Sequence, residues 1–105
     1  MKEYEICITL RYNDGSAIEP RKIARIGERL LNYFHGVTFF PQPNEGSWKM
    51  GPVIFRDEIV IFRVLTDKVR SARRLLRRLK EELKQELRQE EILIVERMPR
   101  SCKQP

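Results

Sequence analysis

Apolar and polar residues alternate without interruption near the start of the chain. From residue 4 to residue 12, every second residue is aliphatic or aromatic. This period of two predicts a strand that buries one face. The face expected to be buried carries Tyr4, Ile6, Ile8, Leu10 and Tyr12.

Two later segments have a helical period instead. The first begins at Pro20, a residue suited to the first helical turn, and repeats apolar residues to Phe34, with Gly36 expected to end it. The second spans residues 68–88, with Asp67 as the expected N-terminal cap. Its apolar stripe consists of Val69, Ala72, Leu76, Leu79, Leu83 and Leu87.

Three further segments are rich in β-branched and aromatic residues and predict strands at residues 37–40, 53–65 and 92–97. In the strand predicted at 53–65, the charged run at 56–58 interrupts the apolar pattern, and a bulge is expected there. Residues 41–52 contain three of the six prolines and two of the five glycines, which predicts a long irregular connection.

The element order is therefore strand, helix, strand, strand, helix, strand. This order is typical of an α+β, ferredoxin-like βαββαβ fold, in which two helices cover one face of a four-stranded antiparallel sheet. We expect a single domain over residues 1–98 and a flexible C-terminal tail over residues 99–105.

Length and composition are consistent with one small globular domain. The chain has 105 residues, of which 41% are hydrophobic, enough for one core. The first ten residues lack the apolar segment of a signal peptide, and no apolar run could cross a bilayer. We therefore expect a cytoplasmic protein without a membrane partner. Cys7 and Cys102 lie far apart in the sequence, and we expect neither a disulfide nor a zinc site.

Basic residues are concentrated in the second predicted helix. The chain has 21 Lys and Arg against 15 Asp and Glu, for a net charge of +6, and residues 68–80 contain seven of these bases. A basic helix end is a candidate phosphate-binding surface, and the alternative is a solvated face with internal ion pairs. A nucleic-acid-binding accessory protein that uses this Arg-rich helix is therefore an alternative function, and its candidate residues are Lys68, Arg70, Arg73, Arg74 and Arg77.

The predicted topology brings three connections together at the opposite end of the sheet. Their polar and aromatic residues are ligand-binding candidates, and the alternative is an ordinary turn with a packed loop anchor. These candidates are Asn13, Asp14, Trp48, Glu90 and Glu91.

Catalytic chemistry finds little support in the sequence. No nucleophile, base and acid stand out as a set, and the one histidine, His35, is expected to lie at a helix C-terminus. We expect no cofactor and no metal site. A small enzyme with its site near Asp14, Trp48 and Glu91 remains an alternative hypothesis.

The uncovered face of the predicted sheet mixes aliphatic residues with arginines, which makes it too apolar to remain fully hydrated. We therefore expect a homodimer, and the favoured function is a non-enzymatic, homo-oligomeric binding module whose small-molecule ligand, if any, is unknown. The dimer-face candidates are Cys7, Thr9, Arg11, Ile59, Ile61 and Arg63.

Four short motifs carry a resemblance to known sequences. They are Tyr-Asn-Asp-Gly at 12–15, Gly-Val-Thr at 36–38, Gly-Ser-Trp at 46–48 and Gln-Glu-Glu-Ile at 89–92. Together they resemble a family of small uncharacterised bacterial proteins of unknown function. The resemblance covers almost the whole chain and agrees with the predicted element order, and it implies no activity, cofactor or catalytic residue.

Overall fold

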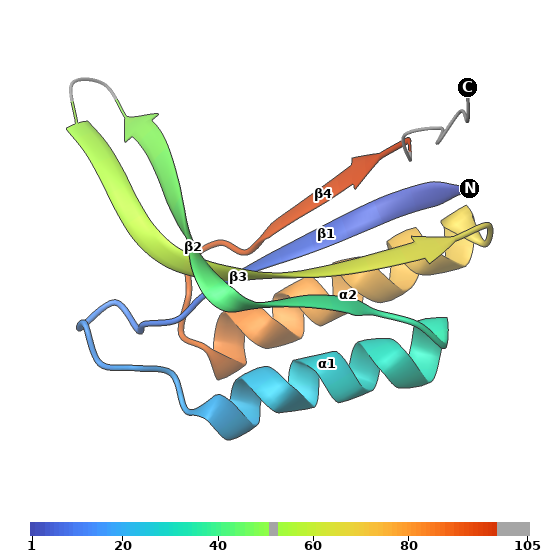
Figure 1. Cartoon of the computed structure of the whole chain (residues 1–105), viewed down its shortest axis with the longest axis horizontal. Helices are drawn as coiled ribbons and strands as arrows, with labels where there is room; N and C mark the ends of the chain where they lie inside the picture. Colours follow the sequence, from blue (N-terminus) through green and yellow to red (C-terminus); the bar gives the residue numbers. More distant parts are fainter. Residues whose placement is uncertain (51–52, 99–105) are drawn as a thin grey trace.

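The chain forms a four-stranded sheet with two helices packed beneath it (Figure 1). A computed structural model describes the backbone of residues 1–50 and 53–98 and the side chains of residues 1–40 and 59–98. The elements are β1 (Lys2–Thr9), α1 (Pro20–Phe34), β2 (Thr38–Met50), β3 (Val53–Thr66), α2 (Val69–Glu86) and β4 (Leu93–Arg97). The predicted tail at 99–105 lies outside the described residues.

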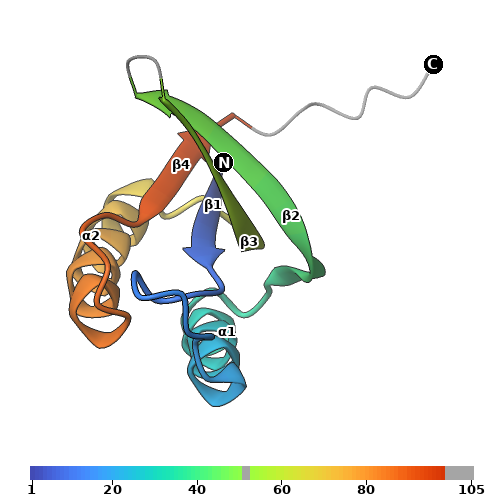
Figure 2. The ribbon, with the colours of Figure 1, turned by 90° about the vertical axis from the view of Figure 1, so that its left-hand side faces the viewer.

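All strand pairs are antiparallel, and the strand order is β2-β3-β1-β4. Both helices cover the same face of the sheet, as the end-on view makes clear (Figure 2). The predicted α+β class and four-stranded antiparallel sheet are thereby confirmed. The face away from the helices is called the open face below.

The core lies between the helices and the sheet, where the alternation read from the sequence places it. In β1 the side chains of Tyr4, Ile6 and Ile8 are buried, and Ile6 is paired with Phe62 of β3. The helices contribute buried apolar residues spaced three or four positions apart, which is the spacing that puts them on one helical face. These residues are Ile23, Ile26 and Leu30 in α1, and Ala72, Leu76, Leu79 and Leu83 in α2.

The end of α1 differs from the prediction by one residue. Gly36 was expected to end the helix, but His35 takes the left-handed conformation with φ 63° and donates its backbone N–H to the Leu31 carbonyl at 2.8 Å. His35 thus occupies the helix C-terminus, the region expected for it, and Gly36 follows outside the helix.

The start of α2 also corrects a prediction. Asp67 does not cap the helix; the N-cap residue is Lys68, and no side chain makes the capping hydrogen bond. Asp67 instead pairs with the N-terminal amine of Met1 at 3.4 Å, because β1 begins beside the end of β3. The hydroxyl of Thr66 accepts the Lys68 backbone N–H at 3.0 Å. Neither described helix has the length and apolarity needed to cross a bilayer.

The largest error of the sequence analysis concerns residues 41–52. Residues 41–50 are not an irregular connection but continue β2, which pairs with β3 as far as Met50 and Val53. The bulge also lies elsewhere, since the register shifts in β2 between Phe40 and Asn44 and not in β3 at 56–58. Two prolines fall within this shift, and proline is tolerated at a bulge on an edge strand because no ladder N–H is needed there.

Candidate functional site

The two helices form one strongly basic layer. Together, α1 and α2 contain eleven Lys and Arg residues and four Glu residues, for a net charge of +7. The whole chain carries only +6, so the sheet and the connections contribute no net positive charge. Because both helices cover the same face of the sheet, this charge is displayed on one side of the molecule.

Five of the eleven bases are neutralised by nearby carboxylates. Across the helix pair, Arg29 contacts Glu82 and also lies 3.8 Å from Glu86. The other ion pairs are Lys22–Glu19, Arg73–Glu96, Lys80–Glu91 and Lys84–Glu81.

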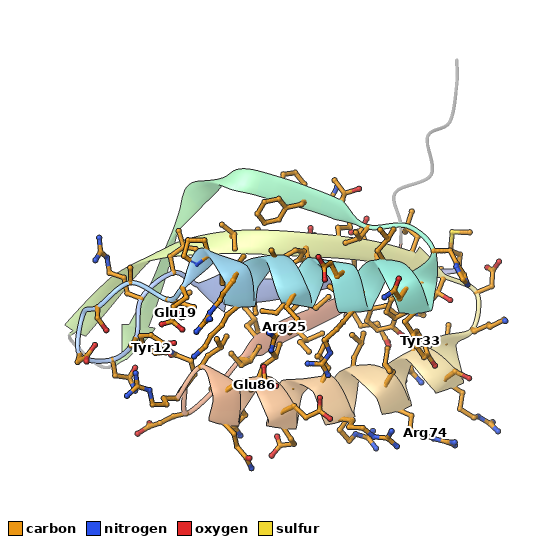
Figure 3. The ribbon with its side chains drawn as sticks, turned by 90° about the horizontal axis from the view of Figure 1, so that it is seen from below. Tyr12, Glu19, Arg25, Tyr33, Arg74 and Glu86 are labelled. Atoms are coloured by element: carbon orange, nitrogen blue, oxygen red, sulfur yellow. The ribbon has the colours of Figure 1, made fainter. Side chains whose placement is uncertain are left out.

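Six exposed arginines of the helical layer form no ion pair with any described residue, and Figure 3 views the layer that carries them. Two lie on α1 and four on α2, and all have the guanidinium group free for an external anion. The six residues, called the free arginines below, are Arg21, Arg25, Arg70, Arg74, Arg77 and Arg78.

The sequence identified only part of this surface. Of the predicted nucleic-acid-binding residues, Arg70, Arg74 and Arg77 are free arginines, and Lys68 is exposed at the start of α2. Arg74 and Arg77 help to line a shallow depression of about 370 Å³ on the outer side of α2. The sequence analysis did not include the basic residues of α1 among the candidates, although the sequence of this predicted helix contains several Lys and Arg residues.

Arg73 has a different role from its neighbours. Its guanidinium makes two hydrogen bonds to the Glu96 carboxylate of β4, at 2.7 and 2.8 Å, and the Tyr4 hydroxyl donates to the same carboxylate at 2.7 Å. These hydrogen bonds, first from Arg73 and then from Tyr4, hold the pKa of Glu96 at about 2. Burial, followed by the hydrogen bond to Glu96, raises the pKa of Tyr4 to about 12. Arg73 therefore fastens α2 to β4 and is not a free phosphate ligand.

This cluster makes a prediction for acid stability. The Glu96 carboxyl has a lower pKa in the folded chain, so its contribution is fully present above its unfolded pKa and is lost as pH falls through about 2. We expect Glu96→Gln to destabilise the protein at neutral pH, with the difference from wild type shrinking below about pH 4. Urea unfolding followed by circular dichroism at a series of pH values measures this. The control is Glu90→Gln, an exposed glutamate without an ion pair among the described residues, and parallel pH curves for Glu96→Gln and wild type would contradict the assignment.

The predicted ligand-binding end is only partly assembled. Asn13 donates from its side-chain amide to the Arg88 carbonyl at 3.2 Å, so the first turn does contact the connection between α2 and β4. Asp14 accepts hydrogen bonds from the backbone and hydroxyl of Ser16, which is an ordinary turn interaction that lowers its pKa. Glu91 pairs with Lys80 at 2.9 Å, and Glu90 is exposed.

Trp48 lies in a different setting from these residues. It belongs to the outer part of β2, where it pairs with Phe55 of β3, and its side chain is outside the described set. The first turn lies on the helix side of the sheet, whereas the outer β2–β3 ribbon rises on the open side (Figure 1). Within the described residues no three His, Cys, Asp or Glu side chains come close enough together to hold a metal ion.

The open face carries a compact network of four charged side chains. Glu5, only 7% exposed, accepts hydrogen bonds from Arg63 at 2.7 and 3.1 Å and from Arg97 at 2.6 Å. Glu3 lies farther from the same two arginines, at 3.5 and 3.6 Å. Two acids and two bases make the network neutral, and the Arg63 guanidinium also lies over the Phe40 ring at 5.0 Å.

The predicted dimer-face residues divide into two groups. Cys7, Thr9, Ile59, Ile61 and Arg63 lie at paired register positions of β1 and β3, and all are partly exposed. Burial, followed by the charge of Glu5, raises the pKa of the Cys7 thiol, which disfavours the reactive thiolate. Arg11 lies beyond the end of β1, where its guanidinium donates to the Gly15 carbonyl at 3.0 Å.

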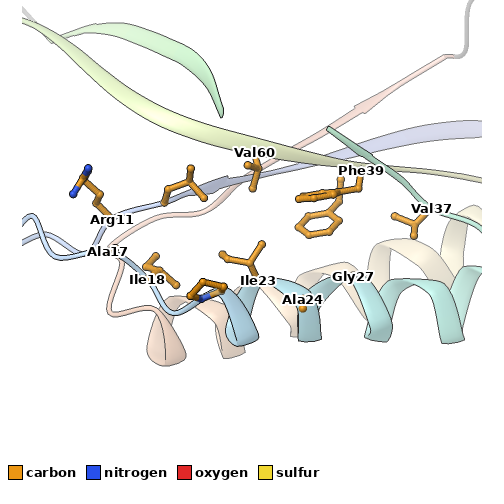
Figure 4. A pocket seen from close by; sticks show the side chains of 12 residues that line it. Arg11, Ala17, Ile18, Ile23, Ala24, Gly27, Val37, Phe39 and Val60 are labelled. Atoms are coloured by element: carbon orange, nitrogen blue, oxygen red, sulfur yellow. The ribbon is translucent and has the colours of Figure 1, made fainter. Parts of the chain in front are cut away.

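An apolar groove between α1 and the strands was not anticipated from the sequence (Figure 4). It has a volume of about 630 Å³, with small residues of α1 on one side and Phe39 and Phe62 of the sheet on the other. The only signal in the sequence was the presence of Ala24 and Gly27 within the apolar stripe of the first helix. The lining consists of Leu10, Arg11, Ala17, Ile18, Pro20, Ile23, Ala24, Gly27, Val37, Phe39, Val60 and Phe62.

No protein-family model, curated protein or solved structure matches this chain.

Proposed function

We propose that this protein is a non-enzymatic nucleic-acid-binding module that contacts the phosphate backbone through its helical layer. The observation that carries the proposal is the set of six exposed free arginines on one side of the molecule. Guanidinium groups bind phosphate oxygens in a bidentate manner, and Arg is favoured over Lys wherever such contacts matter. Four of the six belong to α2, the helix for which the sequence predicts this role.

The arrangement favours contacts to phosphate rather than to bases. Backbone contacts position a protein on nucleic acid without reading its sequence. Arg74 and Arg77 are one helical turn apart and share the shallow depression on the outer side of α2. We therefore expect binding with little sequence preference and a steep dependence on salt.

The sequence favours a homo-oligomeric binding module and offers a nucleic-acid-binding accessory protein as an alternative; the proposal adopts that alternative, because six arginines of the helical layer form no ion pair with a described residue. The sheet order, the antiparallel pairing and the shared helical face support a ferredoxin-like topology as part of it. A cytoplasmic location, as the sequence predicts, would give such a module access to its ligand.

Fluorescence anisotropy with a labelled DNA duplex and a labelled single-stranded RNA tests the proposal across 50 to 200 mM salt. We expect tight binding at low salt that weakens steeply with added salt. In Arg74→Gln/Arg77→Gln, two phosphate contacts are lost, so the slope of log affinity against log salt should fall by about 1.8 for a duplex.

The matched control is Lys2→Gln/Arg11→Gln, which removes the same charge from residues outside the helical layer. It should retain nearly the wild-type slope. Equal losses in the two double variants would show that net charge alone attracts the nucleic acid, and undetectable binding by the wild-type protein at 50 mM salt would refute the proposed function.

A further inference from the structure

A pocket of about 340 Å³ lies between α1 and α2, next to the depression on the outer side of α2. The buried side chains of Leu30 and Leu79 line its inner part, and exposed side chains of both helices line its rim. Arg29 of α1 and Glu82 of α2 also line it, and they pair with each other across the two helices. The carboxylate at this pocket is therefore already neutralised, and it does not repel an anionic ligand.

Tyr33 is an exposed aromatic residue at the rim of this interhelical pocket. It is 45% exposed, and Figure 3 shows it between the two helices. Its ring meets the Phe34 ring edge to face, with centroids 5.0 Å apart and an interplanar angle of 68°. In such a pair each ring covers at most one face of the other. At least one face of the Tyr33 ring is therefore left uncovered by Phe34, and a flat ligand can stack on it.

Free arginines lie on both sides of Tyr33. Arg25, Arg29 and Tyr33 follow one another at intervals of four residues, so they occupy successive turns on one side of α1. This side is turned toward α2, because Arg29 contacts Glu82. Arg25 and Arg78 are free arginines, and Arg78 lines the pocket itself. An exposed aromatic ring beside guanidinium groups is the combination that binds single-stranded nucleic acid, because bases stack on the ring and phosphates contact the guanidinium groups.

Stacking on Tyr33 selects bases that are unpaired. In a duplex each base is stacked between its neighbours, and it reaches a protein ring only after it is flipped out of the helix at a cost in free energy. Asn32, also at the rim, has a side-chain amide that can donate to and accept from a base edge. Because stacking tolerates every base, one stacked base is consistent with the weak sequence preference expected for the phosphate contacts.

We propose that the interhelical pocket holds an unpaired base of a single-stranded nucleic acid, stacked on Tyr33, while phosphates of the same strand contact Arg78 and Arg25. The inference rests on the proposed nucleic-acid-binding function and adds the class of its ligand, a strand with unpaired bases. Phosphate contacts alone do not read the bases. Tyr33 carries no charge, so its contribution can be measured separately from that of the arginines.

Fluorescence anisotropy with three labelled probes of about 12 nucleotides tests the proposal. The probes are oligo(dT), an abasic strand with the same phosphates, and a DNA duplex. We expect Tyr33→Ala to lower the affinity for oligo(dT) about 5- to 100-fold, because the stacked base loses its platform. Its affinity for the abasic strand and the duplex should remain within about twofold of wild type, and the slope of log affinity against log salt should not change.

Three further variants separate stacking from charge and from folding. Arg78→Gln should weaken the binding of all three probes and reduce the salt slope by about 0.7 for the single strands. Tyr33→Phe keeps the ring and should bind oligo(dT) as the wild type does. The matched control is Leu31→Ala, at a 48%-exposed residue of α1 that is not among the described residues lining the pocket, and it should leave every affinity unchanged.

Oligo(rU) is measured in parallel with oligo(dT). A loss of affinity in Tyr33→Ala that is confined to one of these two strands assigns the pocket to RNA or to DNA. If Tyr33→Ala weakens neither strand more than it weakens the abasic strand and the duplex, the pocket does not hold a base and the inference is overturned, although the phosphate contacts stand. Undetectable binding of every probe by the wild-type protein would instead refute the proposed function, and the inference with it.

Discussion

Phe62→Ala is expected to lower the free energy of unfolding by about 3–5 kcal/mol. The Phe62 side chain is 2% exposed at the centre of β3, where its ring stacks on that of Phe39 with centroids 4.9 Å apart. The ring also lies close to α1, since a Cβ atom on Gly27 would lie only 3.1 Å from the Phe62 ring. Truncation would therefore open a cavity between helix and sheet that adjoins the existing groove.

Phe39→Ala is the matched control for this prediction. The two rings stack on each other, but Phe39 is 41% exposed, so its removal should cost about 1 kcal/mol or less. Urea unfolding at one fixed protein concentration measures both values. Similar losses for the two variants would mean that the groove closes over Phe39 in solution.

The helices and the inner strands were predictable because burial imposes a period on the sequence. The buried positions of β1 and α2 recur at the spacing of a strand and of a helix, and no distant residue is needed to recognise them. The outer part of β2 was not predictable in this way. Its prolines and glycines are typical of loops, and only the sheet order shows that β2 is an edge strand, where a proline-containing bulge is tolerated.

The candidate site was predictable only as far as it depends on local charge. The arginines of α2 stand together in the sequence, but the partner that occupies Arg73 is Glu96, which follows 23 residues later. In the same way, the sequence predicts Asp67 as a helix cap, because only the structure shows that the N-terminal amine lies beside it and pairs with its carboxylate. The sequence alone does not show which basic residues form ion pairs, because their partners are acidic residues that the fold brings near from other elements.

Glu5→Gln is expected to destabilise the fold by about 1–3 kcal/mol. The substitution keeps the shape of the side chain but removes the charge that Arg63 and Arg97 share, leaving two guanidinium groups without their closest carboxylate. Both arginines are partly exposed, so water offsets part of the loss and the effect stays below that of a fully buried pair. Since Glu5 itself is buried, most of the effect should persist at 0.5 M salt.

Glu3→Gln separates this effect from a general loss of negative charge. Glu3 faces the same two arginines but at 3.5 and 3.6 Å, so the expected cost is below about 1 kcal/mol and should be screened by salt. Urea unfolding of both variants at one fixed protein concentration, at low salt and at 0.5 M salt, measures the two changes. If Glu3→Gln costs as much as Glu5→Gln, the four side chains act as a diffuse charge cluster and Glu5 is not the centre of the network.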